Sequence, residues 1–476
     1  MTYPRIATLR DSAGFQARLD ELQLDLPHNP QFQPGIACAL ARPLKTSVAT
    51  LGNRFCILPM EGWDGTLDGH PTDLTKRRWE RFGISGAKLI WGGEAVAVRH
   101  DGRANPNQLV INDGTMPGLS MLRTTLINAH RERFTDVDNL SVGLQLTHSG
   151  RYSVPNEDRQ RRPRTIYRHP ILDSRCGIES DATLLTDAEL DQLADDFVAA
   201  AGRAQQCGFT WVDIKHCHGY LGHELLSAWS RPGRYGGSFE NRTRFLRTIV
   251  SGIRTTCPGL GIGVRVSVFD WSPFCPGDHS VGVPEVTDNY KCGFGGDTSG
   301  QGINLEEPIR FLQLLSDLNI EFICTTCGSP YYNPHIQRPA LFPPSDGYLP
   351  PEDPLVGVHR QIAVTAELKR YLPDSVVVGS GYSYLQQWLP AVGDAVIEQG
   401  MADVIGVGRM VLSYPELPAD VIAGTPMQRK QICRTFSDCT TAPRNGLVSG
   451  CFPLDPFYKR HADRETLLQA KSTVSD

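Results

Sequence analysis

Residues 186–220 read TDAELDQLADDFVAAAGRAQQCGFTWVDIKHCHGY, and this stretch decides the fold. Its first part predicts a helix, because Thr186 and Glu189 form a capping box, apolar residues recur on one face, and Gly208 supplies a C-terminal stop. The apolar run 209–214 then predicts a strand that is buried along its whole length. A helix followed by such a strand is the unit of a parallel sheet covered by helices.

The same unit recurs along the chain. Each apolar run is rich in Val, Ile and Phe, and an amphipathic segment separates it from the next run. Eight such units favour a closed (β/α)8 TIM barrel, of the α/β class, over an open sheet. The expected strands begin at Asn53, Ala87, Leu140, Phe209, Gly261, Ile320, Ser375 and Ala402, and further helices are expected near Asp73, Gly118, Asn241, Glu306, Leu355 and Tyr384.

Three connections that follow strands are unusually long, namely 147–185, 269–305 and 327–354. Long connections inside a compact domain usually act as lids or binding loops, so we expect these βα loops to form lids above one mouth of the barrel. The chain is then expected to consist of an N-terminal extension (1–35), the barrel (36–425) and a cysteine-rich C-terminal cap (426–476).

The composition is that of an ordinary globular protein, with 40% hydrophobic residues, a net charge of −5 and a pI near 6.2. This charge gives no indication of a nucleic acid or an anionic membrane as partner. The sequence contains no apolar run long enough for a signal peptide or a membrane span. We therefore expect a cytoplasmic protein, monomeric or homo-oligomeric, that acts on a small molecule, with its 13 cysteines largely reduced.

Lys215, His218 and Tyr220 follow directly after the strand of the opening stretch. The residues that follow barrel strands form the catalytic face of a TIM barrel. Lys215 and His218 are suited to clamp a substrate carbonyl or carboxylate, and Tyr220 is suited to deliver a proton to an adjacent carbon. The alternative is a buried structural histidine and a lysine whose stem packs on the surface.

Other strand ends also carry unusual residues. The amide of Gln145 offers a donor and an acceptor to the edge of a heterocycle. Arg265 lies inside a strand, so its charge requires an anion or a carbonyl, or else an internal salt bridge with Asp213 or Glu94. Glycine turns end the runs 375–381 and 402–408, where the backbone of a barrel commonly holds a phosphate. One ligand would satisfy all of these groups, namely a heterocycle with a phosphate tail.

The segment HGYL, with LLSAWSRPGRYGGSFENRTRF after it, closely resembles the signature of the old yellow enzyme family, the NAD(P)H:flavin oxidoreductases built on an FMN-binding barrel. The pieces NRFCILPM, GGEAVAV, LQLTHSGR, VRVS and GVGRMVLSYPELP occur in the order of that family, so the resemblance spans roughly residues 40–418. It implies FMN as cofactor and NAD(P)H as reductant.

The resemblance also implies roles for individual residues. Pro59, Met60 and Ala95 would line the flavin through their backbones, Gln145 would bond its pyrimidine edge, and Arg265 would lie near its N1–C2 carbonyl. His218 matches a ligand of the substrate oxygen or anion, and Tyr220 matches the proton donor. The residues expected at the FMN phosphate are Gly379, Ser380, Gly408 and Arg409.

Two positions depart from the family pattern. Lys215 stands where His or Tyr is common, and its stronger point charge could shift preference from neutral enones toward carboxylates, or let the lysine donate a proton itself. Glu61 stands where Thr or Cys often touches the flavin O4. A carboxylate there disfavours an anionic reduced flavin unless it is protonated or paired; the alternative is a capping or salt-bridge role away from the ring.

The segment CRTFSDCTTAPRNGLVSGC near the C-terminus resembles the iron–sulfur segment of the dienoyl-CoA reductase and trimethylamine dehydrogenase branch. Its cysteines Cys433, Cys439 and Cys451 are one ligand short of a cluster site, so we expect a degenerate cap without metal. His461 as a fourth ligand of a zinc site is the alternative. The chain also leaves no room for the extra nucleotide-binding domains of those relatives and contains no G-x-G-x-x-G, so the nicotinamide and the substrate are expected to use one cavity in turn.

These observations predict an FMN-dependent NAD(P)H oxidoreductase that reduces the activated C=C bond of an α,β-unsaturated carbonyl or carboxylate. One alternative is amine oxidation or demethylation, with Asp270, Trp271 and Glu61 around a cation. A second is a non-redox hydrolase or lyase that uses His218 with Lys215 and contains no flavin. A third is a binding protein that retains FMN without turnover. The sequence does not decide among substrates or between NADH and NADPH.

Overall fold

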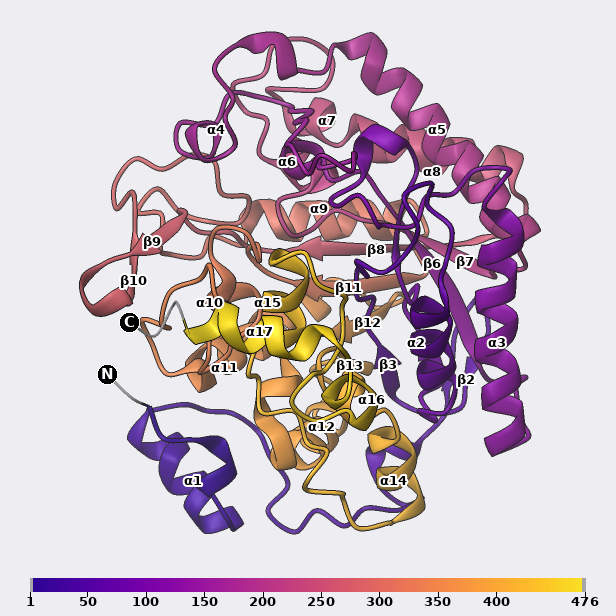
Figure 1. Cartoon of the computed structure of the whole chain (residues 1–476), viewed down its shortest axis with the longest axis vertical. Helices are drawn as coiled ribbons and strands as arrows, with labels where there is room; N and C mark the ends of the chain where they lie inside the picture. Colours follow the sequence, from indigo (N-terminus) through magenta and orange to yellow (C-terminus); the bar gives the residue numbers. More distant parts are fainter. Residues whose placement is uncertain (1–2, 473–476) are drawn as a thin grey trace.

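The computed structural model describes residues 3–472, and it shows a closed barrel of parallel strands surrounded by helices (Figure 1). Within these residues, eight strands form a ring in which β4 pairs with β6 and β13 pairs with β3, so no edge stays open. The predicted (β/α)8 barrel is confirmed. In ring order the strands are β3 (Phe55–Ile57), β4 (Leu89–Ile90), β6 (Ser141–Thr147), β7 (Trp211–Ile214), β8 (Gly261–Ser267), β11 (Phe322–Thr326), β12 (Val376–Gly379) and β13 (Val404–Val407). One more strand, β5 (Ala95–Ala97), follows β4 in the chain and pairs with the last residues of β6.

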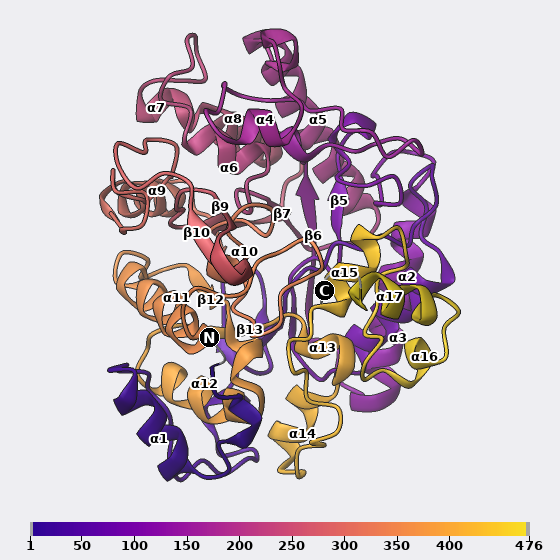
Figure 2. The same cartoon turned by 60° about the vertical axis from the view of Figure 1, so that its left-hand side comes forward.

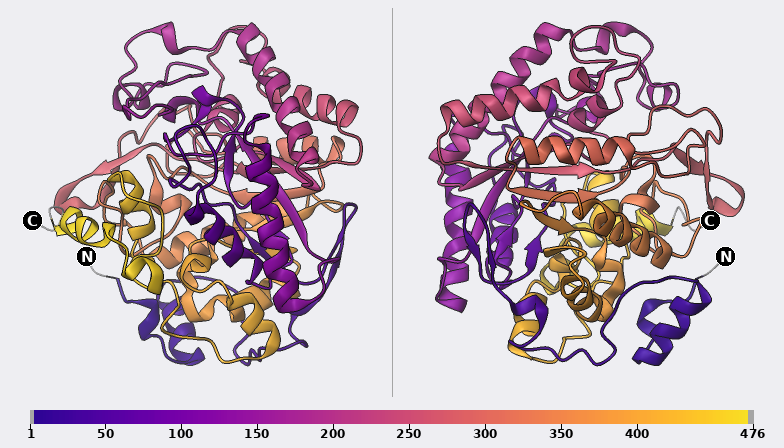
Figure 3. Two further views of the ribbon diagram at one scale, coloured as in Figure 1. Left: turned by 45° about the vertical axis from the view of Figure 1, so that its right-hand side comes forward. Right: turned by 180° about the vertical axis from the view of Figure 1, so that it is seen from behind.

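The long helices cover the outside of the barrel (Figure 3). The helix expected after Thr186 is α5, and both hydrogen bonds of its capping box with Glu189 are present. The helix expected near Tyr384 begins later, because a 3-10 helix with a kink at Gln386 (φ 54°) occupies Tyr382–Trp388. The outer helices are α2 (Asp73–Gly83), α3 (Met116–Phe134), α5 (Asp187–Gln206), α8 (Arg244–Thr256), α9 (Glu306–Asp317), α11 (Pro354–Lys369) and α12 (Leu389–Glu398).

The three long connections and the connection after β7 carry short elements of their own above the barrel. A buried ion pair ties two of the loops together, since Arg151, after β6, binds Asp173 in its own connection and Glu224 at 2.5 Å in the loop that follows β7. These short elements are α4 (Leu172–Arg175), α6 (Leu221–Leu226), α7 (Phe239–Arg242), α10 (Pro334–Gln337) and the hairpin of β9 (Phe274–Pro276) with β10 (Gly282–Pro284).

Both ends of the chain pack against the barrel domain. The first helix, α1 (Ser12–Glu21), stacks Phe15 on Trp388 with 4.6 Å between ring centroids. The C-terminal cap lies beside α2 (Figure 2), where Asp455 pairs with Arg77 at 2.9 Å. None of the described helices combines the length and the apolar character needed to cross a membrane. The remaining short elements are β1 (Leu44–Lys45), β2 (Thr50–Leu51), α13 (Met410–Ser413), α14 (Leu417–Ala423), α15 (Asp438–Arg444), α16 (Pro456–Lys459) and α17 (Asp463–Ser472).

Large aromatic side chains fill the interior of the barrel. Trp211 lies edge-on to Trp91 with 4.9 Å between ring centroids, and Phe322 lies 4.8 Å from Trp211. Glycines make this possible, because a Cβ added at Gly263 or at Gly261 would lie 2.9 Å from Trp211, and one at Gly143 would lie closer still. The packed interior closes the barrel below its upper mouth, so a ligand can enter only above these rings.

Replacing Gly143 with Ala should destabilise the fold by about 1–3 kcal/mol, because the new methyl group overlaps the Trp211 ring in a close-packed interior. Gly202→Ala is the matched control. Its added Cβ meets only the Cys257 sulfur, at 3.6 Å, and lies within helix α5, so this change should stabilise by roughly 0.5–1 kcal/mol. Chemical denaturation measures both. Equal stability of Gly143→Ala and the wild type would contradict the tight seating of Trp211.

Candidate active site

A cavity opens at the carboxyl ends of the barrel strands, and its volume is about 280 Å³, taken as the space open to the centre of a water molecule. The catalytic and cofactor-binding residues predicted from the sequence meet there, although they come from strands spread over the whole chain. Gly379 is the exception, because it ends β12 beside the Tyr382 ring and does not line the cavity. The predicted residues that line it are Pro59, Met60, Glu61, Ala95, Gln145, Lys215, His218, Tyr220, Arg265, Ser380, Gly408 and Arg409.

Asp213, near the end of β7, binds two residues that line this cavity, Gln145 and Arg265. Its carboxylate is fully buried and accepts hydrogen bonds from Gln145 Nε2 (2.5 Å), Trp91 Nε1 (2.8 Å) and the backbone N–H of Arg265 (2.7 Å). Burial raises the pKa of Asp213, and the Gln145 and Trp91 bonds oppose that rise. These contacts orient the Gln145 amide with its oxygen available to a ligand.

The guanidinium of Arg265 is not used by the protein as an internal ion pair. Asp213 meets it only through the backbone, and Glu94 pairs instead with Arg78, whose Nε lies 2.9 Å from Glu94 Oε1. The alternative of a salt bridge from Arg265 to Asp213 or Glu94 is therefore not observed in the structure. Arg265 Nε is buried without a hydrogen-bond partner, which leaves a donor for a ligand carbonyl or anion.

Lys215, Tyr220 and Glu61 form one contact group on a wall of the cavity. The Tyr220 hydroxyl donates to Glu61 Oε2 at 2.8 Å and lies 2.8 Å from the Tyr331 hydroxyl. Lys215 Nζ lies 3.8 Å from the centre of the Tyr220 ring and 4.0 Å from Glu61 Oε2. Burial raises the pKa of Glu61, lowers that of Lys215 and raises that of Tyr220 well above its usual value.

His218 is held in an unusual backbone conformation at the same wall. Its φ is 68°, and two serines fix it, since its N–H donates to Ser267 Oγ at 3.0 Å and its carbonyl accepts from Ser329 Oγ at 2.8 Å. Left-handed backbone at a non-glycine residue is costly and persists where the surroundings enforce it. Burial, with the nearby charges of Arg265 and Lys215, lowers the pKa of His218 well below its usual value, so the imidazole is neutral and is able to donate or accept a hydrogen bond.

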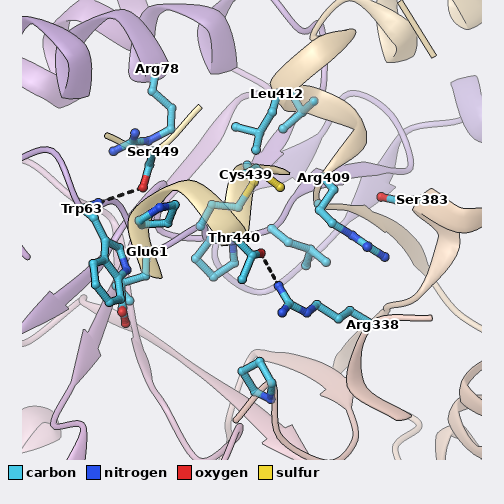
Figure 4. A pocket seen from close by; sticks show the side chains of 18 of the residues that line it. Glu61, Trp63, Arg78, Arg338, Ser383, Arg409, Leu412, Cys439, Thr440 and Ser449 are labelled. Atoms are coloured by element: carbon cyan, nitrogen blue, oxygen red, sulfur yellow. Dashed lines mark hydrogen bonds between the residues drawn. The ribbon is translucent and has the colours of Figure 1, made fainter. Parts of the chain in front are cut away.

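A cluster of arginines forms the opposite end of the cavity (Figure 4). Arg338 donates to Thr440 Oγ1, and Arg409 Nη2 donates to the Pro339 carbonyl at 2.8 Å, yet Nη2 of Arg338 and Nη1 of Arg409 are buried without partners. Burial, and then the charges of Arg444 and Arg409, lower the pKa of Arg338 to about 9. Unpaired guanidinium donors beside the glycine turns create a site for an anion.

The expected C-terminal cap supplies part of the cavity wall, but none of its residues was predicted to line the site. Ser449 accepts a hydrogen bond from the Trp63 backbone at 3.1 Å, and Cys439, Thr440 and Cys451 also line the cavity. Tyr331, Gln337 and Arg338 were missed as well, although they lie in 327–354, a connection expected to act as a lid. Strand-end reasoning cannot find residues that long loops or a distant cap bring to the mouth.

Two of the three cap cysteines, Cys433 and Cys451, are buried thiols, and Cys439 is half-buried. Burial raises the pKa of Cys433 to about 11 and that of Cys451 further, so both stay protonated at neutral pH. Over residues 3–472, no three His, Cys, Asp or Glu side chains are arranged to hold a metal ion, and the zinc alternative with His461 therefore has no support in this geometry. His461 lies 3.8 Å from Asp463 instead.

Comparisons with known proteins agree with this site. The profile of the NADH:flavin oxidoreductase / NADH oxidase family matches residues 39–283. The NADH:flavin oxidoreductase FG08077 of Gibberella zeae is 30% identical over 394 residues, which cover 79% of this chain and 83% of that protein. An NADPH dehydrogenase of Geobacillus thermodenitrificans is 32% identical over 243 residues, 49% of this chain and 64% of the relative.

Solved structures share the fold. A 2-naphthoyl-CoA reductase in complex with 2-naphthoyl-CoA superposes with a TM-score of 0.64 and 18% identity over 88% of this chain. This chain spans 57% of that longer protein. The old yellow enzyme homologue from Zymomonas mobilis gives a TM-score of 0.54 and 20% identity, covering 83% of this chain and 98% of its own.

The arginine cluster predicts that Arg409→Gln and Arg338→Gln each weaken FMN binding roughly tenfold to a hundredfold, since each removes a charge-assisted hydrogen bond worth about 1.5–3 kcal/mol. Fluorescence titration of flavin-free protein with FMN measures this. Arg360→Gln is the control, because Arg360 pairs with Glu352 at 2.6 Å and does not line the cavity. An equal loss in the control would show that net charge matters and not these particular donors.

Proposed function

The chain belongs to the NADH:flavin oxidoreductase / NADH oxidase family and works with FMN and NAD(P)H, and from this premise we propose that it reduces the activated C=C bond of an α,β-unsaturated carbonyl or carboxylate. The observation that carries the proposal is the arrangement of Lys215, His218 and Tyr220 on one wall of the cavity that the flavin-binding residues also line. The reacting carbon and its activating group can therefore be held beside the cofactor.

The residues present fit FMN. Three buried donor atoms have no protein partner, on Arg265, Arg338 and Arg409, and these residues line the cavity, which supports contacts with a flavin carbonyl and a phosphate. We assign Gln145 and Arg265 to the isoalloxazine, with the backbones of Pro59, Met60 and Ala95 beside it. Ser380, Gly408 and Arg409 are assigned to the phosphate, together with Arg338. When bound, FMN accepts hydride from NAD(P)H and donates hydride to the substrate.

The chain's own side chains then activate the alkene. The neutral His218 donates a hydrogen bond to the oxygen of the electron-withdrawing group, and Lys215 adds a positive charge. Both draw electron density away from the β-carbon and stabilise the enolate that develops. Tyr220 supplies the proton that the α-carbon requires. The Lys215 side chain is only 5% exposed, and this burial strengthens its electrostatic interactions.

Amine oxidation receives less support from the geometry. Asp270 and Trp271, two of the three residues expected around a cation, do not line the cavity. Asp270 instead accepts hydrogen bonds from Tyr332 at 2.5 Å and Asn333 at 2.8 Å. Glu61 does line it, but the ammonium of Lys215 lies 4.0 Å away and would repel a cationic substrate. The hydrolase or lyase alternative required a flavin-free protein, which membership in an FMN family opposes.

The deciding experiment is the visible spectrum of the purified protein, recorded anaerobically before and after NADPH or NADH and then with a panel of enals, enones and enoates. The proposal expects a flavin spectrum that bleaches with a nicotinamide and recovers with an activated alkene. Bleaching without recovery by any alkene would overturn the substrate class. If no alkene restores the flavin spectrum and amines reduce the flavin, the amine-oxidising alternative would be favoured.

Lys215→Met should weaken binding of carbonyl and carboxylate ligands roughly tenfold to a hundredfold and leave FMN bound, because a charge-assisted contact worth about 1.5–3 kcal/mol is lost on the substrate side only. Perturbation of the flavin spectrum by a benzoate or phenol titration measures the ligand affinity. Lys45→Met, at an exposed position of β1, is the control. Loss of flavin from Lys215→Met would overturn the separation of substrate and cofactor residues.

A further inference from the structure

The hydroxyl of Tyr220 is already committed within the protein. It has two neighbours, Glu61 Oε2 and the Tyr331 hydroxyl, each at 2.8 Å. A phenol has one proton to give. While Glu61 is an anion, that proton points to the carboxylate, and Tyr331 donates to the Tyr220 oxygen. In this arrangement Tyr220 has no proton to direct at a substrate carbon.

Proton transfer from Tyr220 beside an ionised Glu61 is also electrostatically unfavourable. It would place a phenolate and a carboxylate 2.8 Å apart on a wall where Tyr220 is only 2% exposed. Like charges at such a separation in a poorly solvated site strongly disfavour double ionisation. The geometry therefore calls for a protonated Glu61 at the moment when Tyr220 acts.

The surroundings of Glu61 are suited to hold that proton and then to release it. Its side chain is 14% exposed, and its polar neighbours are Lys215 on the loop after β7, Tyr220 at the start of α6, Tyr331 on the loop after β11, and Asn105 on the loop after β5. Arg78 does not add to this set, because its guanidinium is paired with Asp64 and Glu94. Over residues 3–472, Lys215 is the one basic side chain that lies within 4.0 Å of the Glu61 carboxylate.

We propose that Glu61 is the terminal acid of a two-proton relay, Glu61 to Tyr220 to the α-carbon. The Tyr220 O–H bond breaks as the new C–H bond forms, and the Glu61 O–H bond breaks as Tyr220 regains its proton. The hydride and this proton together saturate the C=C bond. The negative charge ends on Glu61, 4.0 Å from Lys215 Nζ, and solvent returns the proton between turnovers. This proposal rests on the proposed alkene reduction.

The relay makes the protonation step depend on pH with a definite sign. Burial raises the pKa of Glu61, and a group with a raised pKa holds its proton to higher pH than usual. The rate at which reduced enzyme converts an alkene should therefore be constant at low pH and fall as pH rises through this raised pKa. In Glu61→Gln that limb should disappear and the rate should drop by roughly 10²–10⁴, the usual contribution of a general acid.

The kinetic test is a proton inventory on the alkene-reducing half-reaction, in mixtures of H₂O and D₂O. In the wild type two protons move in the same step, so the rate constant plotted against the D₂O fraction should give a curve. In Glu61→Gln only one proton moves, so the same plot should give a straight line. Tyr331→Phe is the matched control, since it removes the other 2.8 Å partner of Tyr220 and should keep both the curvature and the pH limb. A curved inventory in Glu61→Gln, or a straight one in the wild type, would overturn the relay.

A second readout does not require turnover. Infrared difference spectra of the FMN-loaded protein during a pH titration should show the carbonyl stretch of a protonated carboxylic acid that is absent from Glu61→Gln and shifted in Tyr220→Phe. A protein that shows this band but reduces no alkene overturns the proposed reaction and supports the shared proton. A protein that reduces alkenes without the band and with a straight inventory overturns the relay alone.

Discussion

The carboxylate of Asp213 lies where the packed interior of the barrel ends and the cavity begins, and the site depends on it. It joins Trp91, which fills the interior, to Gln145 and the Arg265 backbone, which face the ligand. A buried anion is tolerated only when donors surround it, and here three donors do so, two from strands β6 and β8 and one from Trp91 directly after β4. The same hydrogen bonds that stabilise the charge therefore fix the relative positions of the strands and of the groups that would contact the flavin.

Charge is distributed unevenly over the residues that line the cavity. One end gathers Arg338, Arg409 and Arg444, and donors on Arg338 and Arg409 have no partner, so that end requires an anion. The opposite wall pairs Lys215 with Glu61 and is close to neutral overall. A ligand with a phosphate at one end and an uncharged ring at the other fits this distribution, and the ring then lies beside the groups that can move a proton.

Residues at strand ends were predictable from the sequence, because a parallel barrel places the end of every strand at one mouth. Gln145, Lys215 and Arg265 could be assigned to a common site from their positions in the chain alone. The residues that were missed reach the site by other routes. Thr440 and Ser449 come from a cap that packs across the mouth, and Arg338 comes from the middle of a long loop, so only tertiary contacts place them. The fit of Trp211 against glycines of neighbouring strands was equally invisible, because it depends on strand register.

Glu61 changes what Lys215 means for substrate choice. From the sequence, a lysine at this position favours carboxylate substrates, but an ionised Glu61 at 4.0 Å offsets its charge and lies 2.8 Å from Tyr220, the proposed proton donor. Protonation of Glu61 removes both effects at once, since it leaves Lys215 free to hold an anion and Tyr220 free to release its proton. The reverse also holds by linkage, because an anion bound at Lys215 raises the pKa of Glu61 and loads it with a proton. In the proposed relay, binding of an anionic substrate and protonation of Glu61 are therefore one coupled event.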